Sequence, residues 1–181
     1  PEEILDTAEQ RIYEIAHRTQ NRDYVDINDI FVENIKDIQE LERNKGELPG
    51  ITTGFKDLDA MLGGLHKTDL IVLAARPGMG KTAFALNVAQ NAAFAGNSVI
   101  IFSLEMGNKQ LGQRMLAMAA TVDMQNIRRG TLTMEDWQSL SEAQDEFEGK
   151  KIVIDEGVNL SILEMKNKCR RLKAERGLDL V

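Results

Sequence analysis

A glycine-rich turn followed by lysine and threonine constrains the fold of this chain more than any other feature. The turn lies in AARPGMGKTA, residues 74–83. It comes after the apolar run DLIVLAA (69–75), which predicts a strand buried on both faces, and before TAFALNVAQNAAFAG (82–96), which predicts a helix ended by its final glycine. A strand, a glycine-rich turn and a helix in this order form the context of a phosphate-binding P-loop.

The residues of the turn match the P-loop pattern at its chemically important positions. The pattern is G-x-x-x-x-G-K-[ST]; Gly80, Lys81 and Thr82 supply its last three positions, while Ala75 stands where a glycine is usual. Such a turn points backbone N–H groups inward, Lys81 reaches the β and γ phosphates, and the Thr82 hydroxyl ligates Mg²⁺. The sequence therefore predicts that ATP and Mg²⁺ are bound by Ala75, Arg76, Pro77, Gly78, Met79, Gly80, Lys81 and Thr82.

Strands and helices alternate after the turn. The runs SVIIFSL (98–104) and KIVID (151–155) predict two further strands, and LDLV (178–181) looks like the start of another. Helices are predicted through NKQLGQRMLAMAA and over residues 123–129, 133–148 and 160–175. This alternation predicts an α/β sandwich with a mostly parallel sheet and right-handed crossovers.

Two helices are predicted ahead of this α/β region. The first covers residues 2–17, and the second begins after Asp26 and carries an apolar stripe that includes Ile30, Phe31 and Ile35. The stripe needs a partner, which is either another subunit or the rest of the chain. The stretch ERNKGELPG then predicts a linker. We therefore divide the chain into a helical segment (1–20), a linker helix with its linker (21–50) and an ATPase region (51–181).

Acidic residues at the ends of the predicted strands are candidates for activating water. In a parallel sheet the carboxyl ends of the strands gather at the ligand crevice. Glu105 follows one predicted strand, and Asp155 and Glu156 follow another. Each of the three could instead cap a helix or close a turn.

The composition argues against several classes of protein. With 22 Lys and Arg against 29 Asp and Glu, the formal charge is -7 at pH 7, which argues against a chain that coats nucleic acid by bulk attraction. No apolar run approaches the roughly 20 residues of a membrane-spanning helix, and the acidic N-terminus is unlike a secretion signal. The single cysteine, Cys169, cannot form an internal disulfide, and these features together favour a cytoplasmic protein.

The stretch ITTGFKDLDAMLGGLHKTDLIVLAARPGMGKTAFALNVA resembles the entry and P-loop of the DnaB-type replicative helicases, within the RecA-like ATPases. The resemblance continues through FSLEM, RRGTLT, IVIDEG and KCRRLKAERGLDLV, so it covers essentially the whole chain. It implies a RecA-like fold and a ring of six subunits that couples ATP hydrolysis to translocation on single-stranded DNA and duplex unwinding. A helicase loader and a primase are the partners that it implies.

The resemblance also implies roles for individual residues. Glu105, in SLEM, aligns with the catalytic glutamate that activates the attacking water. We assign Lys81, which reaches the phosphates, as the second catalytic residue. Arg114 aligns with an arginine near the nucleotide. Residues 27–44 match the linker helix that docks on the adjacent subunit, and residues 1–17 match a segment that leaves the N-terminal domain.

Part of the family's machinery has no counterpart in this sequence. The family's Walker B aspartate follows the strand that begins here at LDLV, and its DNA-contacting loops and arginine finger come later still. We therefore expect a fragment that also lacks most of the N-terminal domain. KIVIDEG has the form of a Walker B motif, yet we interpret Asp155 as a decoy that satisfies backbone N–H groups or caps the helix beginning near Leu160.

Two other functions stay open on the sequence. One is another RecA-like ATPase, of the recombinase or clock type, because the entry segment and the P-loop are shared more widely. The other is a non-catalytic module on which a loader or primase docks. The linker helix and SLEM favour the helicase.

Overall fold

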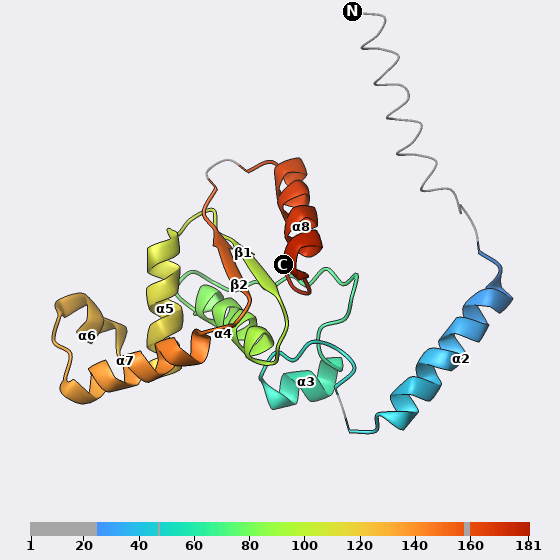
Figure 1. Ribbon diagram of the computed structural model, residues 1–181, viewed down its shortest axis with the longest axis horizontal. Coiled ribbons are helices and arrows are strands. Elements are labelled where there is room, and N and C mark those ends of the chain that lie inside the picture. Colours follow the sequence, from blue (N-terminus) through green and yellow to red (C-terminus); the bar gives the residue numbers. More distant parts are fainter. Residues whose placement is uncertain (1–24, 47, 158–159) are drawn as a thin grey trace, which may run out of the picture. The chain divides into compact units, whose positions relative to one another are not determined.

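The structure, a computed structural model, describes residues 25–46, 48–157 and 160–181 (Figure 1). The chain divides after residue 47 into two units, and each is described by itself. The helix predicted over residues 2–17 lies outside the described residues.

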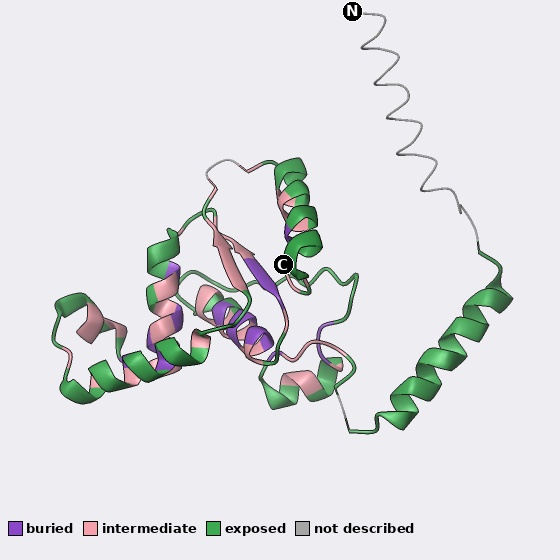
Figure 2. Ribbon diagram, viewed as in Figure 1, coloured by how far each residue is buried: buried purple, intermediate pink, exposed green. Residues whose placement is uncertain are grey.

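The first unit contributes helix α2, which spans Ile27–Arg43. Asp26 caps it as predicted, because its Oδ1 accepts a hydrogen bond from the backbone N–H of Asn28 at 2.8 Å. No residue of α2 is buried, and the helix is drawn as exposed along its whole length in Figure 2. Its exposed apolar side chains are Ile27, Ile30, Phe31, Val32, Ile35, Ile38 and Leu41.

The second unit is an α/β arrangement of helices around a small parallel sheet. Strands β1 (Val99–Phe102) and β2 (Ile152–Asp155) pair in parallel register, from Val99 opposite Ile152 to Phe102 opposite Asp155. No helix in the described ranges is long and apolar enough to cross a membrane. The helices are α3 (Lys56–Leu62), α4 (Lys81–Phe94), α5 (Asn108–Ala120), α6 (Met124–Arg129), α7 (Met134–Phe147) and α8 (Ile162–Arg176).

Strand β1 lies between two parallel neighbours. On the edge away from β2 it meets Leu180, since the N–H of Ile100 donates to the Leu180 carbonyl at 3.0 Å and the N–H of Leu180 donates to the Ser98 carbonyl at 3.1 Å. The strand predicted at LDLV is therefore present as a single bridge opposite Val99. The order across the sheet is β2, β1 and then this segment.

Two buried clusters hold the helices on the sheet. The first joins α4 to β1 through small side chains, with Ala92 and Ala93 packed against Val99. The second joins α4 to α5, with Leu86 packed against Leu111 and Met115. Figure 2 shows the buried positions concentrated on α4, α5 and β1. Because apolar burial stabilises in proportion to the area removed from water, these clusters fix α4 on the sheet and against α5.

The entry segment ahead of the P-loop is tied to α4 by a polar network. Asp59, on α3, accepts hydrogen bonds from the Thr52 hydroxyl at 2.6 Å and from the Thr53 hydroxyl and N–H at 2.6 and 2.8 Å. The Thr53 carbonyl in turn accepts from Nδ2 of Asn91 on α4 at 2.9 Å. Gly54 is required here, because its φ is +80° and a Cβ would lie 1.9 Å from the Asn91 amide.

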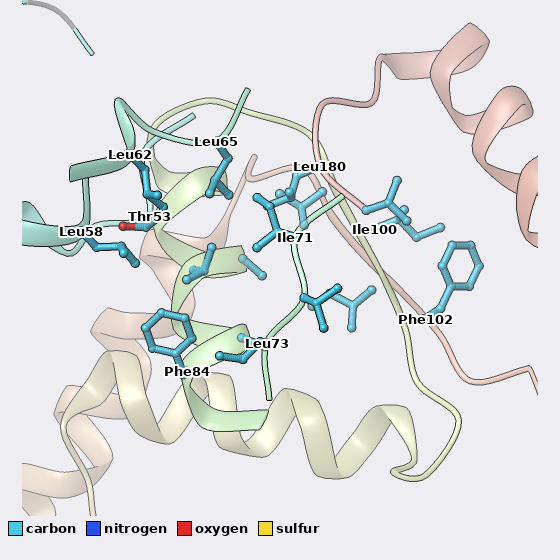
Figure 3. A pocket seen from close by; sticks show the side chains of 17 residues that line it. Thr53, Leu58, Leu62, Leu65, Ile71, Leu73, Phe84, Ile100, Phe102 and Leu180 are labelled. Atoms are coloured by element: carbon cyan, nitrogen blue, oxygen red, sulfur yellow. The ribbon is translucent and has the colours of Figure 1, made fainter. Parts of the chain in front are cut away.

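The strand predicted over residues 69–75 is wrong. Residues 70–75 form no strand and make no backbone hydrogen bond with another described residue, and Leu70 and Val72 are 90% and 81% exposed. The physical reason is a missing neighbour: an apolar cavity of about 450 Å³ is lined by Ile71 to Leu73 on one side and by β1 and Leu180 on another (Figure 3). Without a ladder partner the apolar run does not become a strand.

Replacing Asp59 with Asn should lower the free energy of unfolding by about 1–3 kcal/mol at pH 7, because the hydrogen bonds it accepts are charge-assisted. Burial alone would raise the pKa of Asp59, but the hydrogen bonds from Thr52, Thr53 and Gly54 outweigh it and hold the pKa below 3.8. The native state therefore binds a proton less readily than the unfolded chain, so this stability is present above about pH 4 and is lost at lower pH.

Urea unfolding followed by circular dichroism at neutral pH and near pH 3 measures both effects. Asp57→Asn, an exposed position on the same helix, is the matched control. Equal stability losses for the two variants, or a loss for Asp59→Asn that does not shrink in acid, would contradict this assignment.

Candidate functional site

The predicted P-loop forms an exposed turn that leads into helix α4. The N–H of Met79 donates to the Arg76 carbonyl at 3.2 Å and closes the turn. Gly78 and Gly80 have φ values of +80° and +84°, with no atom within 4 Å of where a Cβ would lie. The glycines are needed for left-handed backbone rather than for space, as the sequence pattern indicated.

The start of α4 presents backbone donors to solvent. Gly80 is the N-cap and offers no capping side chain, and Phe84 makes the first helical hydrogen bond, to the Gly80 carbonyl at 2.9 Å. The N–H groups of Gly80, Lys81 and Thr82 donate to no other described residue. Unused donors at the positive end of a helix dipole suit an anion, and the exposed Lys81 adds a positive charge.

Glu105 lies in the turn after β1, where its side chain is exposed. Helix α4 and β1 are joined by a short turn over residues 95–98, so the helix runs back along the strand (Figure 1). The end of β1 therefore lies toward the same end of the unit as the start of α4. Glu105 and the P-loop therefore lie toward the same end of the unit, and their meeting at a nucleotide stays a prediction.

Arg114 lies on α5, half-buried, and forms no ion pair with another described residue. Its neighbour Met115 is buried with Leu86 of α4 in the shared cluster. Arg114 is therefore carried by a helix that packs directly on the P-loop helix.

The carboxylate of Asp155 is engaged in structural hydrogen bonds. Its carboxylate accepts hydrogen bonds from Lys168 Nζ on α8 at 2.5 Å and from the N–H of Gly157 at 3.0 Å. The Lys168 ammonium is the main reason why the pKa of Asp155 lies below 3.8, while burial opposes the shift. Asp155 thus satisfies a backbone N–H, as predicted, but it does not cap α8, where Ser161 and Glu164 form a capping box.

Glu156 caps a helix. Its Oε2 accepts from the N–H of Asn108, the first residue of α5, at 2.6 Å. The pair of acidic residues in KIVIDEG is therefore divided between two structural contacts, one to α8 and one to α5.

The sequence interpretation missed the docking of the entry segment beside the P-loop helix. The Phe55 ring stacks on Phe84 of α4, with centroids 4.9 Å apart and an interplanar angle of 18°. Together with the Thr53–Asn91 hydrogen bond, this contact holds the entry segment along α4. The signal in the sequence was the Thr-Thr-Gly-Phe stretch shortly before an aspartate, which is typical of a side-chain-capped turn.

The side chains at the start of α4 suit Mg²⁺ that is bound mainly through the phosphate oxygens of a nucleotide. No group of three or more His, Cys, Asp or Glu side chains in the described residues could hold a metal ion. The Thr82 hydroxyl, at the start of α4, is one oxygen that could ligate a metal ion. Mg²⁺ is commonly bound through few protein ligands together with substrate phosphates, so such a donor set suits Mg²⁺ delivered with a nucleotide.

Comparison with known proteins agrees with this geometry. Residues 50–181 match the family described as the DnaB-like helicase C terminal domain. The chain is 45% identical over 181 residues to the replicative DNA helicase DnaC of Bacillus subtilis, covering 99% of this chain and 40% of that protein. It is 44% identical over 179 residues to the replicative DNA helicase DnaB of Geobacillus stearothermophilus, covering 98% and 39%.

Two solved structures share the fold. The first, an ATPase domain, superposes with a TM-score of 0.78 at 33% identity, covering 87% of this chain and 56% of that one. The second, described as a DnaB-like replicative helicase and its interactions with primase, superposes with a TM-score of 0.76 at 31% identity, covering 96% of this chain and 41% of that one. The chain spans about 40% of the length of the curated relatives it matches. It belongs to the DnaB-like replicative helicase family, and residues 50–181 correspond to the family's C-terminal, RecA-like ATPase domain.

Proposed function

We propose that residues 75–82 bind Mg·ATP and that this chain works within an ATP-driven replicative helicase that translocates on single-stranded DNA. The observation that carries the proposal is the start of α4. There, two left-handed glycines, unused backbone donors, Lys81 and Thr82 follow one another within five residues, 78–82. No packing or capping role among the described residues of the second unit requires that combination, whereas a triphosphate does.

The chain's own residues divide the work of the proposed site. The backbone N–H groups and Lys81 hold the phosphates, and Thr82 offers its hydroxyl to the metal. Bound Mg²⁺ would neutralise charge on the β and γ phosphates. Glu105, exposed at the end of β1, is the group proposed to orient a water and accept its proton. Arg114 is proposed to lie near the nucleotide.

The proposals on assembly and partners concern a full-length protein. By this we mean a helicase as long as the relatives, in which these 181 residues occupy the matching positions. The apolar side chains of α2 are more than a third exposed, which supports docking of this helix on a neighbouring subunit in a ring of six. A helicase loader and a primase are further proposed partners. The proposed location is the cytoplasm, where a bacterial replicative helicase works.

The alternatives carried by the sequence are less well supported. A recombinase or a clock-type ATPase shares the P-loop, but the family match over residues 50–181 and the identities above 40% are to replicative helicases. A purely docking role leaves the unused donors of α4 without a purpose. Turnover of ATP with and without single-stranded DNA distinguishes the three.

Replacing Lys81 with Ala should weaken binding of a fluorescent ADP analogue about tenfold or more, because a hydrogen-bonded charge contributes about 1.5–3 kcal/mol. Glu105→Gln should keep this affinity and lower ATP turnover about 10²–10⁴-fold, since it removes the base and leaves the cradle. Titration and steady-state assays of the full-length protein measure both. Unchanged affinity in Lys81→Ala would rule out the phosphate site.

Replacing Phe31 and Ile35 together with Asp should lower the oligomer mass of the full-length protein in light scattering. The reason is that two charges would replace exposed apolar side chains proposed to be buried between subunits. Glu33→Ala with Asp37→Ala, on the same helix, is the matched control. A ring of unchanged mass would contradict subunit docking and favour packing within the chain.

Replacing Asp155 with Asn should leave the Mg²⁺ dependence of ATP hydrolysis nearly normal in the full-length protein, because this carboxylate is held by Lys168 and Gly157. The amide keeps an acceptor for Gly157 and loses only the charge. Titration of turnover against Mg²⁺ is the measurement. A collapse of turnover with an intact fold that is accompanied by a large shift in the Mg²⁺ dependence would place Asp155 in the metal site.

A further inference from the structure

We propose that Glu156 is a positioning residue, which fixes the turn that carries Glu105 by capping the helix that follows it. The turn, here called the Glu105 loop, comprises residues 103–107 between β1 and α5. The inference rests on the role proposed above for Glu105. It adds that the second acidic residue of KIVIDEG acts on catalysis through the loop rather than through the nucleotide.

The C-terminal end of the Glu105 loop lacks a cap of its own. Its last residue, Gly107, is the N-cap of α5 and makes no side-chain cap hydrogen bond, because glycine has no side chain. Glu156 supplies the missing acceptor from 48 residues away, with Oε2 at 2.6 Å from the Asn108 nitrogen. A carboxylate at this position also interacts favourably with the positive end of the helix dipole.

The N-terminal end of the loop is held by the residue next to Glu156. The Ser103 N–H donates to the Asp155 carbonyl at 2.9 Å, as the last rung between β1 and β2. The Ser103 hydroxyl also closes the loop on itself, donating to the Met106 carbonyl at 2.6 Å and accepting from the Met106 N–H at 3.2 Å. Consecutive residues at the end of β2 therefore hold both ends of the loop.

The hydrogen bonds leave the tip of the loop, Leu104 and Glu105, in solvent. Met106 packs against the cluster of Leu86, Leu111 and Met115, whereas Leu104 and Glu105 are exposed. Because both ends of the loop are held, the backbone at Glu105 is fixed in direction, although Glu105 itself does not contact Asp155 or Glu156. Such preorganisation matters for a group that must meet a water and a phosphate, since misplacement by about 1 Å costs about 10²-fold in rate.

The direction of Glu156 is itself fixed by the turn that follows β2. Asp155 Oδ1 accepts from the Gly157 N–H, and Lys168 of α8 holds the other carboxylate oxygen. A Cβ at Gly157 would lie 2.5 Å from the Leu160 side chain, so this turn tolerates no larger residue without a shift. The acidic pair thus forms one brace, in which Asp155 shapes the turn and Glu156 reaches α5.

A hydrogen-bonding role and a catalytic charge predict different responses at position 156. Glu156→Ala removes the acceptor, whereas Glu156→Gln keeps an oxygen that accepts from the Asn108 N–H and removes the charge. If Glu156 acts by holding the loop, Gln restores most of the function. If Glu156 acts as a base at the nucleotide, Gln is as defective as Ala.

The test compares ATP turnover and affinity for a fluorescent ADP analogue in full-length wild type, Glu105→Gln, Glu156→Ala and Glu156→Gln. Glu142→Ala, an exposed glutamate on α7, is the matched control and should behave as wild type. We expect Glu156→Ala to keep its affinity within about twofold and to lose about ten- to a hundredfold in kcat. Glu156→Gln should recover most of that loss. Hydrogen exchange of the amides of residues 104–108 should rise in the Ala variant alone.

Three results would overturn the inference. A normal kcat in Glu156→Ala, with Glu105→Gln inactive, would contradict the positioning role of Glu156 and would leave the proposed function unaffected. Equal loss in the Ala and Gln variants assigns Glu156 a charge-dependent role instead. Normal turnover in Glu105→Gln removes the proposed function and the inference with it. Should Glu156→Ala fail to fold, Glu156→Asp replaces it, because it keeps the charge but is one methylene too short to reach Asn108.

Discussion

The packing of helix α4 on strand β1 is the contact on which the rest of the ATPase unit depends. Ala92 is fully buried and Ala93 and Val99 are each 1% exposed, so small side chains let the helix approach the sheet closely. The short turn between helix and strand, with Gly96 at a φ of +96°, reverses the chain. As a result the start of the helix and the end of the strand lie toward one end of the unit, and both the proposed phosphate donors and Glu105, the proposed water-activating carboxylate, lie there.

The two acidic residues at the end of β2 make structural contacts. A Walker B motif and the sequence KIVIDEG have the same residue pattern, yet here one carboxylate is neutralised by Lys168 and the other caps α5. The strand that carries them is on the opposite edge of β1 from Leu180. A residue pattern that resembles a metal site is thus used here for structural contacts to α8 and α5.

Local patterns predicted those elements whose ends are determined locally. Helix α4 begins at the P-loop lysine and ends before Gly96, α2 begins after the Asp26 cap, and α5 spans the whole of NKQLGQRMLAMAA. The P-loop could be predicted as a candidate site because phosphate binding demands consecutive residues. Helix α3 went unassigned, since it has seven residues and no side-chain cap hydrogen bond at Phe55.

Contacts between distant residues could not be read from the sequence. The run 69–75 has the composition of a strand, but composition reports a tendency to be buried and not the presence of a hydrogen-bonding neighbour. The bonds from Asn91 to Thr53 and from Asn108 to Glu156 join residues 38 and 48 positions apart. The sequence therefore offered Glu156 only as one of several acidic candidates, and the structure was needed to give it a contact.

A structure of the full-length protein with Mg·ADP and aluminium fluoride, a mimic of the transferring phosphoryl group, tests the central claim most directly. The account predicts phosphates against the N–H groups of Gly80, Lys81 and Thr82, and the Glu105 carboxylate directed at the water in line with the aluminium. The Asn108–Glu156 hydrogen bond should be intact in that state. A nucleotide bound elsewhere, or a Glu105 loop turned away from the phosphates, would contradict the account.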